Sequence, residues 1–268
     1  MLSNCSILCL FKLAKYLAWI VANTKNQISG QTRINIQSCF PLLTDSQKKS
    51  FLKDSLHHTS CAFFELAAIW NHPINDVLNL ITTHKINDSF FTPDKAKIII
   101  APHHGSWELL NLWLANEGPL YSLYKPARSK KVDQYVFKKR SRNKAILVPS
   151  NTSGLRKLLQ GLKNNASCMI LPDQRPAIGT AQINSSFFNN QVPTSLLIKR
   201  LASKVDCNIF IASITRNLKT GEYQLIVDSL KTTEFLSCDL KSATYLNKSI
   251  ETFIVNTERQ YQWAYRRF

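Results

Sequence analysis

The sequence predicts an α/β fold with a mostly parallel or mixed sheet, flanked by helices and preceded by a helical N-terminal part. From residue 95 onward, short runs of β-branched and aromatic residues alternate with helical stretches, which is typical of βαβ units. Residues 45–70 instead carry apolar side chains at helical spacing. No repeat or Ser/Gly/Pro-rich linker divides the chain, so we expect a single domain over residues 1–268.

The N-terminal residues 1–23 form an apolar stretch that is interrupted by Lys12 and Lys15 on one helical face. These charges disfavour a membrane-spanning helix, which needs about 20 apolar residues. Two interpretations remain: an amphipathic helix packed on the core, or a helix in the membrane interface with Tyr16 and Trp19 at headgroup depth. The basic character of the chain favours the interface helix. We expect no secretory signal, because no small-residue cleavage site follows.

The elements beyond residue 95 follow from composition and period. The predicted strands are residues 95–102, 120–126, 144–150, 167–174, 207–216 and 223–229, and the predicted helices are residues 107–117, 129–141, 152–164, 193–204 and 241–258. This alternation implies a sheet that is covered on both faces. In such sheets, ligands bind beyond the carboxyl ends of the strands. The polar residues at these ends are His103, His104, Tyr124, Lys125, Asp173 and Gln174.

The net charge narrows the class of partner. The chain has 34 Lys and Arg against 17 acidic residues, a formal charge of +17. Such a charge favours nucleic acid, an anionic membrane surface, a phosphorylated substrate or an acidic carrier protein. The seven cysteines include no C-x-x-C pair, so we expect neither a disulfide framework nor a metal site, and a reducing compartment is favoured.

The stretch "HHGSWE" contains the best candidate for catalytic residues. His103 and Glu108 are five residues apart, and a carboxylate that fixes the tautomer of an imidazole makes it an effective general base. The alternative is a helix start, with Glu108 as a first-turn acid that the helix dipole favours. The sequence contains no G-x-S-x-G elbow, phosphate-binding loop or H-E-x-x-H motif. A reaction in which the base activates the acceptor hydroxyl directly therefore fits better than one in which an enzyme nucleophile forms a covalent acyl-enzyme intermediate.

Two further segments have more than one interpretation. "LYKPARSKKVDQYVFKKRSRNK" is a solvated basic face, a phosphate-binding or carrier-docking surface, or a nucleic-acid face, although no nucleic-acid-binding motif accompanies it. In "ILPDQRP", Asp173 and Gln174 could orient a base or an arginine, or simply form a turn. Phe187 and Phe188 would line an apolar substrate site or belong to the core.

Taken in order, "HHGSWE", "YKP…VDQYVFKKRSR", "PDQRP" with "FFNNQVPT", and "RQYQWAYRRF" resemble the motifs of a known family. That family is the Kdo-dependent lauroyl/myristoyl acyltransferases of lipid A biosynthesis, which are lysophospholipid acyltransferase-like. The segment "RINIQSCFP" and Glu65 also resemble it, and the match runs from about residue 10 to Phe268.

The resemblance implies a glycerolipid acyltransferase-like fold and a direct acyl transfer. His103 would be the base, Glu108 its orienting partner, and His104 would not take part. Arg140 would bind the acceptor phosphate or the thioester region, and Asp173 would support either that arginine or the residues behind those that contact substrate. Gln174, Tyr124 and Lys125 would complete the substrate site.

The resemblance also implies the substrates and the location. The acyl group would pass from a thioester of acyl carrier protein to a hydroxyl of a lipid A precursor, with no further cofactor and no nucleic acid. The enzyme would lie on the cytoplasmic side of the inner membrane as a peripheral or monotopic protein. Coenzyme A is the alternative donor, and a lysophospholipid or an aminolipid is the alternative acceptor. An alternative of another class is a nucleic-acid-binding protein that uses the basic helix 129–144.

Overall fold

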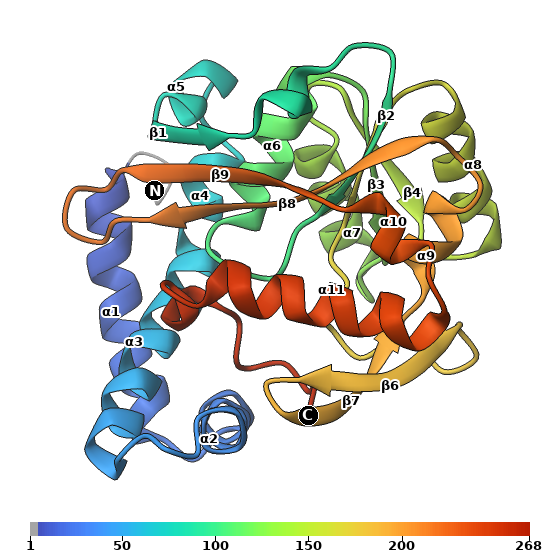
Figure 1. The fold of residues 1–268 in the computed structure, drawn as a ribbon. Coiled ribbons are helices and arrows are strands. Elements are labelled where there is room, and N and C mark those ends of the chain that lie inside the picture. The colour runs from blue at the N-terminus through green and yellow to red at the C-terminus, as the bar shows by residue number, and fades with distance from the viewer. Residues whose placement is uncertain (1–4) are drawn as a thin grey trace.

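The computed structural model describes residues 5–268 and shows a seven-stranded sheet in the order β1-β9-β8-β2-β5-β3-β4 (Figure 1). All neighbouring strands are parallel except β8 and β9, which are antiparallel. The predicted mixed α/β fold is therefore confirmed. The strands are β1 (Ile81–Ile86), β2 (Ala96–Ile100), β3 (Leu120–Tyr124), β4 (Ala145–Pro149), β5 (Ser167–Ile170), β8 (Cys207–Arg216) and β9 (Tyr223–Leu230).

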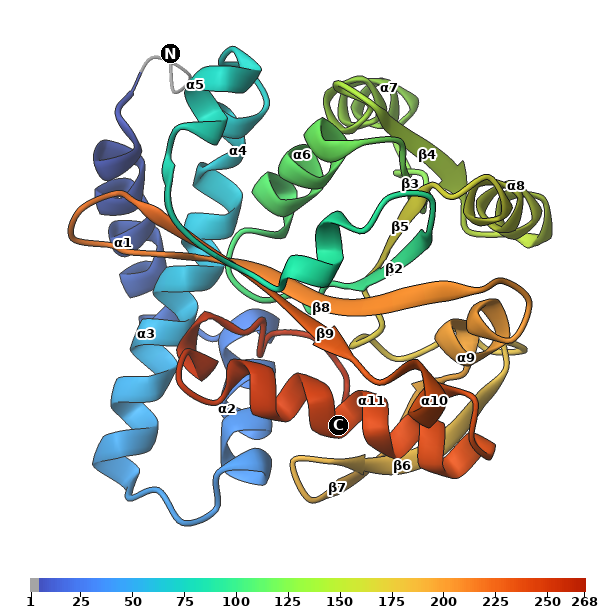
Figure 2. The same ribbon diagram turned by 45° about the horizontal axis from the view of Figure 1, so that its top comes forward.

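Helices cover both faces of this sheet, as the continuous apolar runs of its central strands require (Figure 2). Alternation along β2 shows the two sides: Ile98 and Ile100 belong to one buried cluster, and Ile99 and Ala101 to the other. The first cluster includes residues of α8 (Thr152–Lys163), α9 (Leu197–Ala202) and α11 (Asp239–Ile254). The second includes the buried face of α6 (Trp107–Glu117), next to which lies α7 (Lys130–Arg140).

The N-terminal helices stand beside the sheet rather than on its faces (Figure 1). They are α1 (Ile7–Asn23), α2 (Gln27–Cys39), α3 (Asp45–Phe64), α4 (Leu66–Ile69) and α5 (Ile74–Leu78). The predicted helix 45–70 is divided at Glu65 into α3 and α4. The carboxylate of Glu65 pairs with the buried guanidinium of Arg216 on β8.

The first helix presents two different faces. Leu10, Phe11 and Ala14 are buried against the protein, whereas the side chains of Tyr16 and Trp19 are 65% and 63% exposed. None of the helices within residues 5–268 is by itself long and apolar enough to cross a membrane. Only α1 and α2 taken together meet that test, with a bend of 80° between them.

One predicted helix, residues 193–204, is wrong at its start. Residues 190–195 form β7 (Asn190–Ser195), which pairs with β6 (Gln182–Phe187) as a separate antiparallel hairpin, and α9 starts only at Leu197. The two-residue turn at Phe188 and Asn189 has positive φ angles of 45° and 60°, which matches the twist of a hairpin. Phe187 is fully buried and stacks on Phe268, so it belongs to the core.

Candidate active site

The turn between β2 and α6 carries His103 to the edge of the sheet where the parallel strands end. Gly105 makes this turn possible, because its φ angle is 59° and a Cβ atom there would lie 2.1 Å from the carbonyl oxygen of Ile214. The neighbouring strand β5 ends at Ile170, and Asp173 follows three residues later. Two parallel neighbours thus bring His103 and Asp173 to the same edge.

Asp173 holds the imidazole of His103 in place. Its Oδ1 atom lies 2.8 Å from His103 Nδ1, and its Oδ2 atom accepts a hydrogen bond of 2.8 Å from the backbone N–H of His103. Burial raises the pKa of the Asp173 carboxyl, but the charge and hydrogen bonds of His103 outweigh this and leave the pKa below its ordinary value. An ionised carboxylate only accepts hydrogen bonds, so Nδ1 carries a proton, and in the neutral imidazole Nε2 keeps its lone pair.

Glu108 pairs with Arg140 rather than with His103. Arg140 Nε donates hydrogen bonds of 2.9 and 3.1 Å to the two carboxylate oxygens, and Nη2 donates to Oε1. Trp70 Nε1 donates to the same carboxylate at 3.3 Å. The predicted contact between His103 and Glu108 is wrong, as is the predicted support of Arg140 by Asp173. The first turn of α6 rotates Glu108 toward α7, while Asp173 arrives beside His103 on the adjacent strand.

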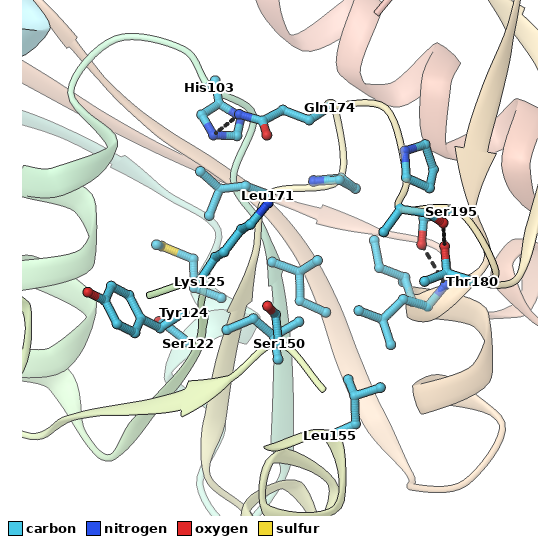
Figure 3. Close-up of a pocket in the computed structure, with 18 of the residues that line it drawn as sticks. His103, Ser122, Tyr124, Lys125, Ser150, Leu155, Leu171, Gln174, Thr180 and Ser195 are labelled. Atoms are coloured by element: carbon cyan, nitrogen blue, oxygen red, sulfur yellow. Dashed lines mark hydrogen bonds between the residues drawn. The ribbon is translucent and has the colours of Figure 1, made fainter. Parts of the chain in front are cut away.

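A cavity of about 1350 Å³ opens at this edge and is lined by His103, Gln174, Tyr124 and Lys125 (Figure 3). Glu108 and Arg140 also line it, so six of the seven predicted site residues share one cavity. The Tyr124 hydroxyl donates to the Asp133 carboxylate.

The cavity reaches both faces of the sheet, because side chains of one strand alternate between them. On the side of α6 and α7 the walls include polar side chains, and the Ser122 hydroxyl donates to the Asn111 side chain at 3.1 Å. On the side of α8 and α9 the cavity has an apolar branch, beside which the exposed cations Arg156, Arg200 and Lys204 also line the cavity. The residues of this apolar branch are Leu123, Leu155, Leu159, Ile170, Ile198 and Leu201. Figure 3 shows Leu155 at the end of the pocket opposite to His103.

Comparison with known proteins assigns the chain to a family. The profile of the family described as "Bacterial lipid A biosynthesis acyltransferase" matches residues 6–268. The chain belongs to this family. It is 20% identical over 238 residues to the "Lipid A biosynthesis palmitoleoyltransferase" of Escherichia coli (strain K12), covering 88% of this chain and 77% of that protein. It is 24% identical over 252 residues to a "Lipid A biosynthesis acyltransferase" of Haemophilus influenzae, covering 91% and 76%.

Among solved structures, the 1-acyl-sn-glycerophosphate acyltransferase PlsC of Thermotoga maritima matches with a TM-score of 0.39 and 12% sequence identity. The match covers 93% of this chain and 95% of that one. The family membership makes the present chain an acyltransferase and confirms the resemblance that its ordered motifs predicted.

His104 of the acyltransferase is a structural residue. Its ring is buried, with Nδ1 at 3.1 Å from the Ser213 hydroxyl and Nε2 at 3.1 Å from the carbonyl oxygen of Thr257. Burial lowers the pKa of His104 to about 4, so the ring is neutral near pH 7. It lies between β8 and the C-terminal segment, and it does not line the cavity.

The sequence had given no role to the C-terminal segment of the acyltransferase, although that segment completes the site. The backbone N–H of Gln262 donates a hydrogen bond of 2.8 Å to the carbonyl oxygen of His103. The ring of Tyr265 lies 4.8 Å from the imidazole and Trp107 flanks it at 5.4 Å. The motif "RQYQWAYRRF" was the signal for this segment, but contacts across more than 150 residues cannot be read from it.

We expect Arg140→Ala to lower kcat/KM of the acyltransferase by about 10- to 100-fold, the effect of losing a charged hydrogen bond. The side chain of Glu108 is 7% exposed and would lose its cation beside the cavity. Lys138→Ala and Lys139→Ala are the matched controls, because Lys138 is exposed and Lys139 hydrogen-bonds the exposed Asn71 side chain and lies over the Tyr135 ring. Similar small effects in all three variants would show that Arg140 acts as a surface charge. Steady-state kinetics of acyl transfer measures the difference.

Proposed function

We propose that this enzyme transfers a fatty acyl group from a thioester of acyl carrier protein to a hydroxyl of a lipid A precursor. His103 acts as the general base, Asp173 orients it, and no acyl-enzyme forms. The observation that carries the proposal is the His103–Asp173 pair, whose imidazole lines a cavity that has an apolar branch and several cationic side chains. The names of the related proteins support the lipid A precursor as the acceptor.

With the proton of the neutral His103 ring on Nδ1, Nε2 is the atom that can accept a proton from the acceptor. The acceptor hydroxyl donates its proton to Nε2 while its oxygen attacks the thioester carbonyl carbon. Asp173 stabilises the imidazolium that results, because its carboxylate lies 2.8 Å from Nδ1. The tetrahedral intermediate collapses, the carbon–sulfur bond breaks, and the imidazolium returns the proton to the thiolate.

The side chains that line the cavity favour a substrate that carries negative charge and a fatty acyl chain. The apolar side chains of the branch between α8 and α9 match the chemistry of a fatty acyl chain. Five cationic side chains line the cavity and form no ion pair with any carboxylate of residues 5–268. They are Lys125, Arg156, Arg175, Arg200 and Lys204. Such unpaired cations favour phosphate groups on the acceptor and an acidic carrier as the donor.

The assay that tests the function measures transfer of a labelled acyl group to a purified lipid A precursor. Acyl carrier protein and coenzyme A thioesters are compared as donors, and a lysophospholipid replaces the precursor in a parallel reaction. Transfer to the precursor from the carrier thioester is the expected result. Transfer to the lysophospholipid alone would assign another lipid acceptor. Binding of RNA that His103→Ala does not affect, with no transfer to either lipid, would favour the nucleic-acid-binding alternative.

We also propose that α1 binds the cytoplasmic face of the inner membrane. Its outward side carries Tyr16 and Trp19, which stack on each other with their centroids 6.3 Å apart, next to the exposed Lys12 and Lys15. Amphipathic helices with exposed aromatic and basic residues lie in the headgroup region of anionic bilayers.

We expect the double substitution Tyr16→Ser and Trp19→Ser to weaken binding to vesicles that contain phosphatidylglycerol by about tenfold or more, because apolar burial in the interface is lost. Phe91→Ser is the matched control, since this ring is 57% exposed and lies away from α1. Vesicle co-sedimentation measures the difference. Equal binding of the wild type and the double variant would contradict the role of α1.

A further inference from the structure

Attack on a thioester places negative charge on the carbonyl oxygen, and hydrogen-bond donors must meet this charge. His103 and Asp173 cannot do so, because their hydrogen bonds serve the proton transfer. The side-chain amide of Gln174 lies beside them, with Nε2 at 3.1 Å from His103 Nε2 (Figure 3). We propose that Gln174 is a catalytic residue whose amide N–H stabilises the oxyanion. This inference rests on the proposed role of His103 as the base.

The direction of this contact follows from the tautomer. His103 Nδ1 carries its proton toward Asp173, so Nε2 is an acceptor and the Gln174 amide is the donor. The amide therefore donates to the Nε2 lone pair of His103, to which the acceptor hydroxyl has to pass its proton. An entering hydroxyl displaces the amide from the imidazole. In the tetrahedral intermediate, the attacking oxygen and the oxyanion are bonded to the same carbon, so the displaced amide needs only a small rotation to reach the oxyanion.

The surroundings of Gln174 fix its backbone and leave its side chain in the cavity. Arg267 is 3% exposed, and its Nη1 donates a hydrogen bond of 3.1 Å to the carbonyl oxygen of Gln174. The same guanidinium is held by the carbonyl oxygen of Pro193 and by Asn247 Oδ1. Gln174 itself is exposed toward the cavity. The fixed backbone keeps the amide beside the imidazole, and the side chain, exposed to the cavity, can leave His103 Nε2 and then meet the oxyanion.

The proposed step balances in atoms and electrons. The hydroxyl proton goes to His103 Nε2, the carbon–oxygen bond forms, and the π electrons of the carbonyl move to its oxygen. Gln174 keeps both of its amide protons and shares one with that oxygen. When the carbonyl re-forms, the carbon–sulfur bond breaks and the thiolate takes the proton from His103.

The test compares Gln174→Met with the wild type, since methionine keeps the side-chain length and removes the donor. We expect kcat for transfer from a lauroyl thioester of acyl carrier protein to fall by about 10²–10³, with KM changed by less than about threefold. Hydrolysis of the same thioester without acceptor should fall by a similar factor, because attack by water forms the same oxyanion. Gln160→Met is the matched control, as Gln160 is exposed on α8 and does not line the cavity.

The rates of acyl transfer and of thioester hydrolysis distinguish the possible roles of Gln174. Unchanged or faster transfer would show that the amide only covers the imidazole, and this outcome would overturn the proposal. A fall in transfer without a fall in hydrolysis would also overturn it, because Gln174 would then only position the acceptor. If the His103→Ala variant is inactive but the Gln174→Met variant keeps full acyl-transfer activity, only the oxyanion role of Gln174 is overturned. If the His103→Ala variant keeps full activity, the proposed role of His103 as the base is overturned.

Discussion

Replacement of His103 by alanine is expected to lower the turnover of acyl transfer by about 10²–10⁴, the usual contribution of a positioned general base. The imidazole is the group whose Nε2 lone pair faces the cavity, while Asp173 holds the other nitrogen at 2.8 Å. The apolar and cationic walls of the cavity are unchanged in this variant, so the acceptor lipid should still bind. Turnover with labelled thioester and the acceptor dissociation constant are the two measurements.

The partner of His103 can be tested in the same assay. Asp173→Asn is expected to lose about as much turnover as His103→Ala, because an amide no longer fixes the proton on Nδ1. The double variant should be little worse than either single variant if the two residues act as one unit. Glu108→Gln keeps an oxygen that accepts from Arg140, so it should lose far less. His84→Ala is the control, because His84 is exposed on β1. A severe loss in Glu108→Gln with a mild one in Asp173→Asn would reinstate the His103–Glu108 pair.

Arg216→Met is expected to lower the free energy of unfolding by about 3–5 kcal/mol, because it leaves the buried carboxylate of Glu65 without its cation. The side chains of Arg216 and Glu65 are 0% and 1% exposed, and two hydrogen bonds of 3.0 and 2.8 Å join them. Arg216 Nη2 also donates a bond of 2.6 Å to the carbonyl oxygen of Gly105. The turn that carries His103 thus rests on this pair. Urea unfolding followed by tryptophan fluorescence measures the loss.

Two variants check that burial of the charge is the cause. Glu65→Leu combined with Arg216→Met should recover part of the stability, because two apolar side chains replace the pair and no charge is left unpaired. Asp206→Asn removes one partner of an ion pair in which the aspartate is 88% exposed, and should cost less than about 1 kcal/mol. An Arg216→Met loss no larger than that of Asp206→Asn would contradict the argument.

The sequence by itself determined six of the seven strands of the large sheet, all but β1, together with most of the longer helices and the edge of the sheet that holds the site. These features depend on near neighbours: the run "KAKIII" has the β-branched composition of a strand, and a helix follows His103 once Gly105 permits the turn. The hairpin of β6 and β7 escaped this reasoning. Its second strand contains a proline, and its turn uses Phe188 at a positive φ angle, which no turn signal in the sequence announces.

The partners within the site were decided only by the tertiary structure. Glu108 is near His103 in sequence, yet one turn of α6 directs it to Arg140, 32 residues away. Asp173 is 70 residues from His103, and the parallel pairing of β2 with β5 brings it to hydrogen-bond distance. The C-terminal segment reaches the imidazole in the same way, through Gln262 and Tyr265. Residue spacing fixes which side chains share one element, whereas strand order and helix rotation fix which side chains meet between elements.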